Sequence, residues 1–310
     1  MKLCGIDINP GEKKEVRLNV PGGGHMDATL IRGAHGGKTL AVTAGVHGCE
    51  YVGIEALRRL SRSLNPEELR GQVILIPLVN PEGFYACAKQ VVPSDGVNLN
   101  RAFPGAREGL ESARRAFAIE QFVYPYTDLL ADLHGGDIHE QVTPFAFFPA
   151  HAAADVVDRS RAAAGALSLP FRVRSSGKNG LYSWAAQRGI PALLLERGCR
   201  GVWAEEDVRA CCDNIHELLV HLDILERHFE PVVQREIARV EYVEAEERGF
   251  WYPAVREGQF VQTGAELGEL RAYDGGLLRR YEALFDGVVL YYTVTLGAQA
   301  ADPLVSYGQV

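Results

Sequence analysis

The residues best suited to chemistry in this chain are His47 and Glu50, three positions apart between two apolar segments. An imidazole nitrogen and a carboxylate oxygen at this spacing can bind one divalent metal ion, and zinc is the expected metal. The motif is short, and short motifs often arise by chance. The simpler alternative is a histidine that ends a strand and a solvated glutamate favoured by a helix dipole. The choice depends on what the rest of the chain supplies.

The segments around this pair are predicted to place it at the end of a buried strand. The apolar run 40–46 has strand length and is interrupted by glycines that favour a tight turn. Apolar residues then resume with helical spacing over 51–64. His47 is expected in the turn, and Glu50 in the first turn of the helix.

Apolar runs of strand length alternate with helical segments through the first 230 residues. The predicted strands are 40–46, 73–79, 129–133, 145–148 and 192–195, and the predicted helices are 51–64, 112–123, 152–166 and 205–229. This alternation predicts an α/β domain over 1–230 with a buried, mostly parallel or mixed sheet. Ligands in such domains collect at the carboxyl ends of the strands, where His47 is expected.

The sequence pattern changes after Pro231. Short runs of β type follow, with many glycines between them and no helical period, at 238–243, 250–253, 267–270 and 287–294. They predict a small all-β domain over 231–310, a barrel or a sandwich. Residues 255–268 resemble a hairpin of lipoyl and biotinyl carrier domains, but a carrier needs a lysine, and the last lysine is Lys178. A carrier function is therefore excluded.

A second histidine, His134, follows another predicted strand and precedes two glycines, which allow a ligand to approach the backbone closely. A single histidine of this kind is more often a hydrogen-bonded structural residue. Together with His47 and Glu50, it would complete a set of two histidines and one carboxylate that leaves a coordination position for water. Zinc in such a site lowers the pKa of bound water to about 7, which provides a nucleophile at neutral pH.

Two further segments carry side chains suited to substrate binding and proton transfer. Asn100 and Arg101 are adjacent in a predicted loop, and a guanidinium suits two-point binding of a carboxylate. Glu196 ends an apolar strand, where burial raises a carboxyl pKa and a nearby cation lowers it, as suits a general base. The alternatives are an ordinary surface arginine, and a glutamate that only pairs with Arg197 or Arg200.

In their order along the chain, these motifs resemble the succinylglutamate desuccinylase/aspartoacylase family, which is related to zinc carboxypeptidases. The motifs that carry the resemblance are His47-x-x-Glu50, Asn98-Leu-Asn100-Arg101, Asp132-Leu-His134 and Glu196. The resemblance covers nearly the whole chain. It implies a three-layer α/β/α domain with a mixed sheet, followed by a small C-terminal all-β domain.

The resemblance also implies roles for individual residues. It implies one Zn²⁺ ion bound by His47, Glu50 and His134. It further implies carboxylate binding by Asn100 and Arg101, and base and acid duty for Glu196.

Two positions depart from the family pattern. Asn98 stands where members often have an aspartate that supports a zinc-binding histidine; an amide accepts a hydrogen bond but raises ligand basicity less than an anion does. Lys89 stands where relatives commonly carry an arginine that stabilises the oxyanion. A lysine keeps the charge and loses the planar fork. Lys89 is therefore a further candidate for substrate binding.

The predicted function is zinc-dependent hydrolysis of the amide bond of a small N-acyl amino acid or related carboxylate. The first alternative is a metallocarboxypeptidase that acts on short peptides. The second is a zinc-binding or ligand-binding relative without catalysis, which Asn98 and Lys89 keep open.

Composition narrows the partners and the location. The formal charge of −8 argues against a nucleic-acid partner, because phosphate binding needs a basic face. No apolar run has the length of a membrane span, and the N-terminus is too polar for a signal peptide. The six cysteines lack framework spacing and indicate reduced thiols, so a cytoplasmic location is expected. The oligomeric state stays open, and a homo-oligomer is compatible with the sequence.

Overall fold

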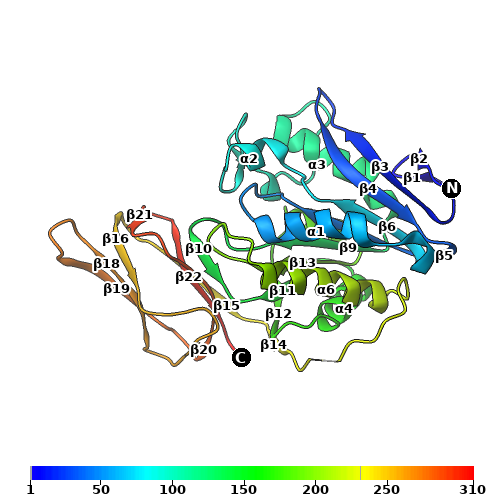
Figure 1. Cartoon of the computed structure of the whole chain (residues 1–310). Coiled ribbons are helices and arrows are strands. Elements are labelled where there is room, and N and C mark those ends of the chain that lie inside the picture. Colours follow the sequence, from blue (N-terminus) through cyan, green and yellow to red (C-terminus); the bar gives the residue numbers. More distant parts are fainter. Residues whose placement is uncertain (1, 231) are drawn as a thin grey trace.

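A nine-stranded mixed sheet forms the centre of the larger part of the molecule (Figure 1). The computed structural model describes residues 2–230 and 232–310. The sheet order is β14 (Arg235–Ile237), β12 (Phe171–Ser175), β11 (Phe145–Pro149), β13 (Ala192–Glu196), β9 (Leu129–His134), β5 (His35–Ala44), β6 (Arg70–Ile76), β4 (His25–Arg32) and β3 (Glu12–Asn19). Strands β13, β9, β5 and β6 run parallel to one another, whereas β11 on one side and β4 on the other run antiparallel to them.

Helices cover both faces of this sheet. Apolar side chains of α1 (Tyr51–Ser63), α4 (Ala154–Gly165) and α6 (Glu205–His221) share one core cluster with the sheet. Those of α3 (Glu111–Phe122) and α5 (Leu181–Gln187) belong to a second cluster on the opposite face. The predicted three-layer α/β/α arrangement with a mixed sheet is therefore confirmed. Within the described residues, no helix is long and apolar enough to cross a membrane.

Several short elements lie at the edges of the layers. They are β1 (Lys2–Leu3), β2 (Ile6–Asp7), α2 (Pro81–Tyr85), β7 (Val91–Val92), β8 (Val97–Asn98) and three 3₁₀ turns, η1 (Pro66–Glu68), η2 (Leu99–Arg101) and η3 (Tyr124–Tyr126). The segment from α2 to η2 connects β6 to α3 and carries Lys89, Asn98, Asn100 and Arg101.

The C-terminal part consists of two antiparallel sheets, which lie beside the larger part in Figure 1. The first contains β10 (Glu140–Val142), β20 (Gly287–Thr293), β22 (Pro303–Gly308) and β15 (Val240–Glu244), with β17 (Phe260–Val261) also paired to β20. The second contains β19 (Leu277–Glu282), β18 (Glu266–Arg271), β16 (Gly249–Pro253) and β21 (Gly297–Ala298). Buried Trp251, Leu270, Val289 and Tyr307 contribute to the core between these sheets. The predicted β-rich C-terminal region is confirmed.

Each part of the molecule contributes one strand to a sheet of the other part. Strand β14, from the C-terminal side of the chain, pairs in parallel with β12 of the large sheet. Strand β10, from the N-terminal side, pairs antiparallel with β20. The expected boundary between residues 230 and 231 falls beside Pro231, which lies outside the described residues.

The predicted helix 205–229 is too long, because α6 ends at His221. Asp223 adopts the left-handed conformation, with a φ of 59°, and a residue in that conformation ends many helices. The following Ile224 carbonyl then accepts a hydrogen bond from the Arg70 backbone at 2.7 Å. Tertiary contact thus diverts a segment whose composition alone favours a longer helix.

Candidate metal centre

The predicted metal ligands leave neighbouring parallel strands at the same edge of the sheet. His47 follows β5 by three residues, and His134 is the last residue of β9, which pairs with β5. Glu50 lies immediately before α1 rather than in its first turn. The carboxyl ends of parallel strands meet at one edge, so the sheet itself brings these side chains together.

Two glycines allow the backbone to turn at this edge. Gly45, directly after β5, has a φ of +64°, a conformation that side chains rarely adopt. Gly135, directly after His134, lies against the carbonyl of Arg197, and an added Cβ would stand 2.1 Å from that oxygen. The strand ends can therefore diverge toward the site without steric conflict.

The donor atoms of these three residues converge. The Nδ1 atom of His47 lies 2.6 Å from Oε1 of Glu50, and Nδ1 of His134 lies 2.9 Å from Oε2 of the same carboxylate. One donor atom from each residue lies within 4.8 Å of the others. All three residues are buried, with 4–7% of their surfaces exposed. Two imidazoles and one carboxylate form a donor set that zinc favours.

The outward nitrogens of both imidazoles are held by oxygen atoms. Nε2 of His134 lies 3.0 Å from Oδ2 of buried Asp132, and the Thr43 hydroxyl donates to the other oxygen of Asp132. Nε2 of His47 lies 3.1 Å from Oδ1 of Asn98. A proton on each Nε2 leaves the Nδ1 lone pairs directed toward Glu50, as metal binding requires. The residues present therefore fit a zinc ion.

Asp132 is a residue whose contribution the sequence reasoning missed. It stands two positions before His134 on β9, and side chains two apart on a strand share a face. That spacing is a signal from which the contact could have been predicted. Asn98 accepts the hydrogen bond that was expected of an aspartate in its place, as a neutral amide.

The charges of the cluster act strongly on one another. Burial opposes ionisation of Glu50, but the charges of His47 and His134 outweigh it and lower the pKa of Glu50 to about 2. Burial also opposes protonation of His134, yet the charges of Asp132 and Glu50 hold its pKa well above 6.5. A buried anionic cluster of this kind attracts a cation, either a proton or a metal ion.

Glu196 lies beside the candidate ligands. It ends β13, where its register partner on β9 is His134, and the Arg197 backbone donates to the His134 carbonyl at 3.0 Å. Burial raises the pKa of Glu196 to about 8, although the charge of His134 opposes the shift. Neither Arg197 nor Arg200 forms an ion pair with it among the described residues. A carboxylate with these properties can accept and return a proton near neutral pH.

A cleft of about 450 Å³ opens over these residues. Asn100 and Arg101 line it together with the three candidate ligands and Glu196. Asn100 is buried, and its Oδ1 accepts a hydrogen bond from the Leu181 backbone at the start of α5. Arg101 is exposed, and its guanidinium donates to the Asn100 carbonyl at 2.8 Å. The structure thus brings six of the seven predicted site residues into one cleft.

Lys89 is not among the residues that line this cleft. Its ammonium lies 3.3 Å from a carboxylate oxygen of fully buried Asp137, and it faces a different cavity near the C-terminal sheets. The backbone carbonyl of Lys89 also accepts a weak hydrogen bond from the Cys49 thiol. In this structure the Lys89 ammonium therefore forms an ion pair with the buried carboxylate of Asp137.

The cleft has further polar and aromatic walls that sequence reasoning did not assign. They are Glu140, Lys178, Tyr182, Tyr242 and Tyr291. Tyr242 and Tyr291 come from β15 and β20, so the C-terminal sheet forms one side of the cleft. No local motif marks Tyr242 and Tyr291, because pairing among β10, β15, β20 and β22 places these two side chains at the cleft.

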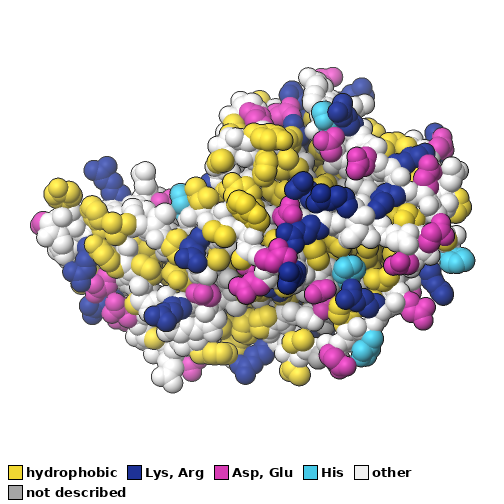
Figure 2. All heavy atoms as spheres, in the orientation of Figure 1, with side chains coloured by type: hydrophobic (Ala, Val, Ile, Leu, Met, Phe, Trp, Pro, Cys, Tyr) yellow, Lys and Arg dark blue, Asp and Glu magenta, His cyan; other side chains and the backbone are white. Residues whose placement is uncertain are grey.

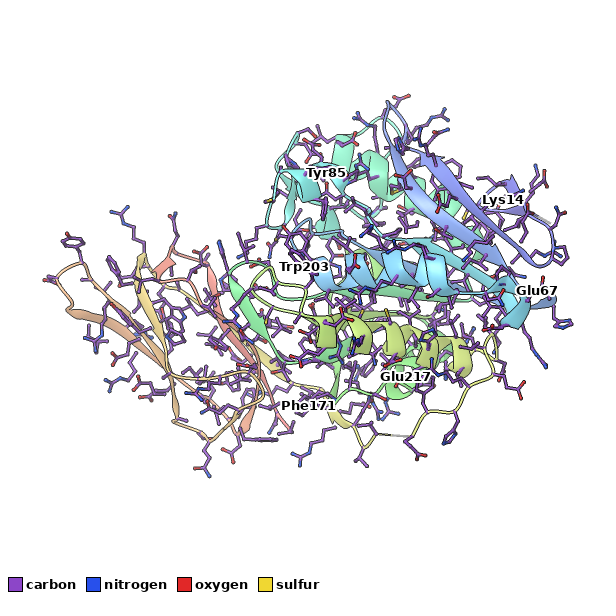
Figure 3. The ribbon with its side chains drawn as sticks, viewed as in Figure 1. Lys14, Glu67, Tyr85, Phe171, Trp203 and Glu217 are labelled. Carbon is purple, nitrogen blue, oxygen red and sulfur yellow. The ribbon has the colours of Figure 1, made fainter. Side chains whose placement is uncertain are left out.

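An aromatic cluster packs around the start of α1, next to Glu50. The ring of Tyr51 packs edge to face against two other rings. The distance between ring centroids is 5.8 Å to Phe84 and 5.7 Å to Trp203. Figure 3 shows Trp203 at this end of α1 with Tyr85 nearby, and Figure 2 shows hydrophobic side chains gathered over α2 and the start of α1. This packing fixes the helix that follows Glu50, and so helps to orient its carboxylate.

Comparison with known proteins agrees with this architecture. The model of the succinylglutamate desuccinylase/aspartoacylase catalytic domain matches residues 36–222. The N-alpha-acetyl-L-2,4-diaminobutyric acid deacetylase of Halomonas elongata is 31% identical over 267 residues, which cover 82% of this chain and 77% of that protein. The succinylglutamate desuccinylase of Ectopseudomonas mendocina is 28% identical over 68% of this chain and 62% of its own length.

Solved structures share the fold over nearly the whole chain. The succinylglutamate desuccinylase/aspartoacylase of Rhodobacter sphaeroides has a TM-score of 0.88 at 27% identity, and covers 99% of this chain and 98% of its own. The product-bound ectoine utilization protein EutE of Ruegeria pomeroyi has a TM-score of 0.89 at 23% identity, with 98% of both chains covered. From the family match and the Halomonas relative, this chain belongs to the succinylglutamate desuccinylase/aspartoacylase family.

Proposed function

We propose that this protein is a zinc-dependent deacylase that hydrolyses the amide bond of a small N-acyl amino acid. The observation that carries the proposal is the convergence of His47, Glu50 and His134 beside Glu196 in one cleft. The names of the Halomonas and Ectopseudomonas relatives both describe removal of an acyl group from an amino acid derivative.

His47 and His134, each through Nδ1, and Glu50 would hold the zinc ion. When bound, zinc supplies a Lewis acid that lowers the pKa of water and polarises a carbonyl. Asp132 and Asn98 keep the two imidazole rings in the orientation that binding requires. The buried, anionic Glu50 stabilises a cation at this position.

Glu196 moves the protons in this proposal. Its carboxylate accepts a proton from the attacking water and later delivers it to the amine that leaves. A raised pKa lets the carboxyl keep the proton taken from water near neutral pH, so the proton is available for the amine that leaves. Its place beside His134 keeps it at the strand edge where the amide would react.

Arg101 and Asn100 bind and orient the carboxylate of the substrate. The Arg101 guanidinium is anchored to the chain by one N–H group, which leaves its other donors for a ligand. A carboxylate held by a guanidinium gains charge-assisted hydrogen bonds and a defined orientation. Lys89 would act on the substrate through its charge alone, because its ammonium pairs with Asp137 and does not line the cleft.

The walls of the cleft favour a small substrate over a peptide. Tyr242 and Tyr291 from the C-terminal sheet line it on one side, and their rings are 6.5 Å apart. The two tyrosines limit the space on this side of the cleft, which a longer peptide would need. A metallocarboxypeptidase remains the second candidate within the same chemistry.

The test is a substrate panel on protein loaded with zinc. N-acetyl and N-succinyl amino acids would be compared with short peptides, with released amine as the readout. The proposal expects turnover of at least one N-acyl amino acid and loss of it after chelation, with recovery when zinc is restored. Turnover of peptides alone would transfer the assignment to a carboxypeptidase, and bound zinc without any turnover would favour a binding protein.

We further propose that 1–230 and 231–310 are two domains that exchange β10 and β14. The six cysteines are unpaired in the structure, which supports a reducing, cytoplasmic location. The proposed partner is a small carboxylate-bearing molecule, and a homo-oligomer is compatible with this assignment.

A further inference from the structure

A small cavity lies beside α6, apart from the cleft described above. It has a volume of about 260 Å³, and within the described chain it shares no lining residue with that cleft. Arg197 lines it from the end of β13, and Asn214 and Glu217 line it from α6, where Figure 3 labels Glu217. The segment after α6 supplies Arg227 and Phe229. Three separate segments of the chain thus meet around this cavity.

Two buried polar atoms at this cavity have no hydrogen-bond partner among residues 2–230 and 232–310. They are Nε of Arg197, which is a donor, and Oδ1 of Asn214, which is an acceptor. Asn214 is 1% exposed, and its Nδ2 group donates to Glu217 at 2.9 Å, so Oδ1 is the unused end of the amide. Nη1 of Arg197 lies 3.7 Å from Asp207, which is too far for a hydrogen bond. A ligand that offered one acceptor and one donor would recover the free energy that these atoms cost.

The Arg197 guanidinium lies along the face of α6 that carries Asn214. Asp207, Cys211 and Asn214 are separated by four and three residues, a spacing that places helical side chains in one row. The guanidinium faces Asp207. Burial raises the pKa of Cys211, and the charge of Arg197 opposes that rise. The donor and the acceptor therefore border the same space.

The charged groups around the cavity have both signs. Arg197 and the exposed Arg227 supply cations, whereas Asp213 and Glu217 supply carboxylates. A guanidinium favours a carboxylate, and the oxygen of Asn214 beside two carboxylates favours an ammonium. A free α-amino acid carries both groups on one carbon atom. The cavity has room for such a molecule, because one water takes only about 30 Å³.

We propose that this cavity is a second binding site, which takes a free α-amino acid with its carboxylate on Arg197 and its ammonium on Asn214. Successive side chains along a strand point to opposite faces, so Arg197 turns away from the cleft that Glu196 lines. Binding at this site does not depend on the function proposed above.

Calorimetry with three small probes tests the class of ligand. L-alanine carries both charged groups, whereas isobutyrate carries only the carboxylate and isopropylamine only the ammonium, each with a methyl group in place of the other. The parent protein is the full chain with Arg101→Ala, which removes the carboxylate contact proposed for the catalytic cleft. We expect one L-alanine per chain, bound more tightly than either other probe by about tenfold or more, because each of those lacks one charge-assisted contact.

Two variants locate the site. Arg197→Met removes the guanidinium and should weaken L-alanine binding by about tenfold or more. Ala210→Leu keeps every polar group and fills part of the cavity, so it should weaken binding even if Arg197→Met folds poorly. Arg209→Gln is the matched control, since Arg209 is an exposed arginine of α6 that pairs with Glu205 and does not line the cavity. It should bind L-alanine as the parent does.

The contrary outcomes are distinct. If L-alanine did not bind, water alone would satisfy Arg197 and Asn214, and the proposal would be wrong. Equal affinities for L-alanine and isobutyrate would exclude recognition of the ammonium. Binding that the wild type showed and the Arg101→Ala parent lacked would place the amino acid in the catalytic cleft. No turnover enters these measurements, so failure of the proposed deacylation would leave their result unchanged.

Discussion

His134 and Glu196 are register partners on the adjacent parallel strands β9 and β13. A candidate metal ligand and a candidate base therefore leave the sheet side by side. The backbone hydrogen bond from Arg197 to the His134 carbonyl, at 3.0 Å, extends this pairing beyond the strand end. The distance between the two functions is thus set by the sheet, the most rigid part of the domain, rather than by loops.

The role of Glu196 predicts a separation of metal binding from turnover. Glu196→Gln keeps the size of the side chain and removes its ability to accept a proton. We expect kcat to fall by roughly 10²–10⁴-fold, as for loss of a general base. Elemental analysis should still find one zinc per chain. A variant that turned over at near the wild-type rate would show that another group acts as the base.

The role of His134 predicts a loss of bound zinc, in contrast to Glu196→Gln, which should retain it. His134→Ala removes one of three proposed ligands and leaves Glu50 without one of its two histidine partners, so bound zinc should fall well below one per chain after dialysis. His139→Ala is the control, because His139 lies five residues away and does not belong to the donor cluster. Equal zinc contents in the two variants would contradict the assigned ligand set.

Asn98 offers a test of how ring orientation affects the metal. Asn98→Ala removes the oxygen that holds Nε2 of His47 at 3.1 Å, and zinc affinity should fall by about 10–100-fold. Asn98→Asp should raise zinc affinity, because an anion makes the imidazole a stronger ligand. Competition with a coloured chelator measures both changes. If both variants bound zinc as the wild type does, Asn98 would have no part in the site.

Arg101 is expected to act on substrate binding. Arg101→Ala removes charge-assisted hydrogen bonds to a carboxylate, and kcat/KM should fall by roughly tenfold or more, mainly through KM. Arg101→Lys should recover only part of the lost kcat/KM, because an ammonium cannot bind a carboxylate at two points as a guanidinium does. Arg107→Ala is the control, since Arg107 is exposed and lies outside the cleft. Unchanged KM in Arg101→Ala would place the carboxylate elsewhere.

The raised pKa of Glu140 predicts a pH-dependent stability for the zinc-free protein. Burial first, and then the charge of Asp137, raise this pKa from 4.5 to about 8, so the folded form holds its proton more tightly than the unfolded chain. The associated stability is present below about pH 4.5 and is lost as the pH rises through about 8. Glu140→Gln lacks this titration, so its Tm should rise relative to wild type across that interval. If the Tm of the wild type and that of Glu140→Gln changed equally with pH, the raised pKa of Glu140 would be contradicted.

Much of the site was predictable because its donors lie at strand ends in recognisable motifs. The alternation of apolar runs placed His47, His134 and Glu196 at the carboxyl ends of strands, and parallel strands bring such ends together. Asp132 could also have been predicted as a partner, since it shares a face of β9 with His134. The end of α6 at His221, and hence the error in predicting helix over 222–229, could not be predicted from composition. It depends on the left-handed conformation of Asp223 and on the backbone contact with Arg70.

By itself, the sequence determined the α/β order of the larger part, the β-rich C-terminal region and the chemical types of the candidate ligands. Only the tertiary structure decided which other side chains share the cleft. Glu140 reaches it because β10 pairs with β20, with Glu140 opposite Thr293 and Val142 opposite Tyr291. The tertiary structure also turned Lys89 toward Asp137. Pairing between segments about 150 residues apart depends on packing and register across the whole fold, which local periodicity does not encode.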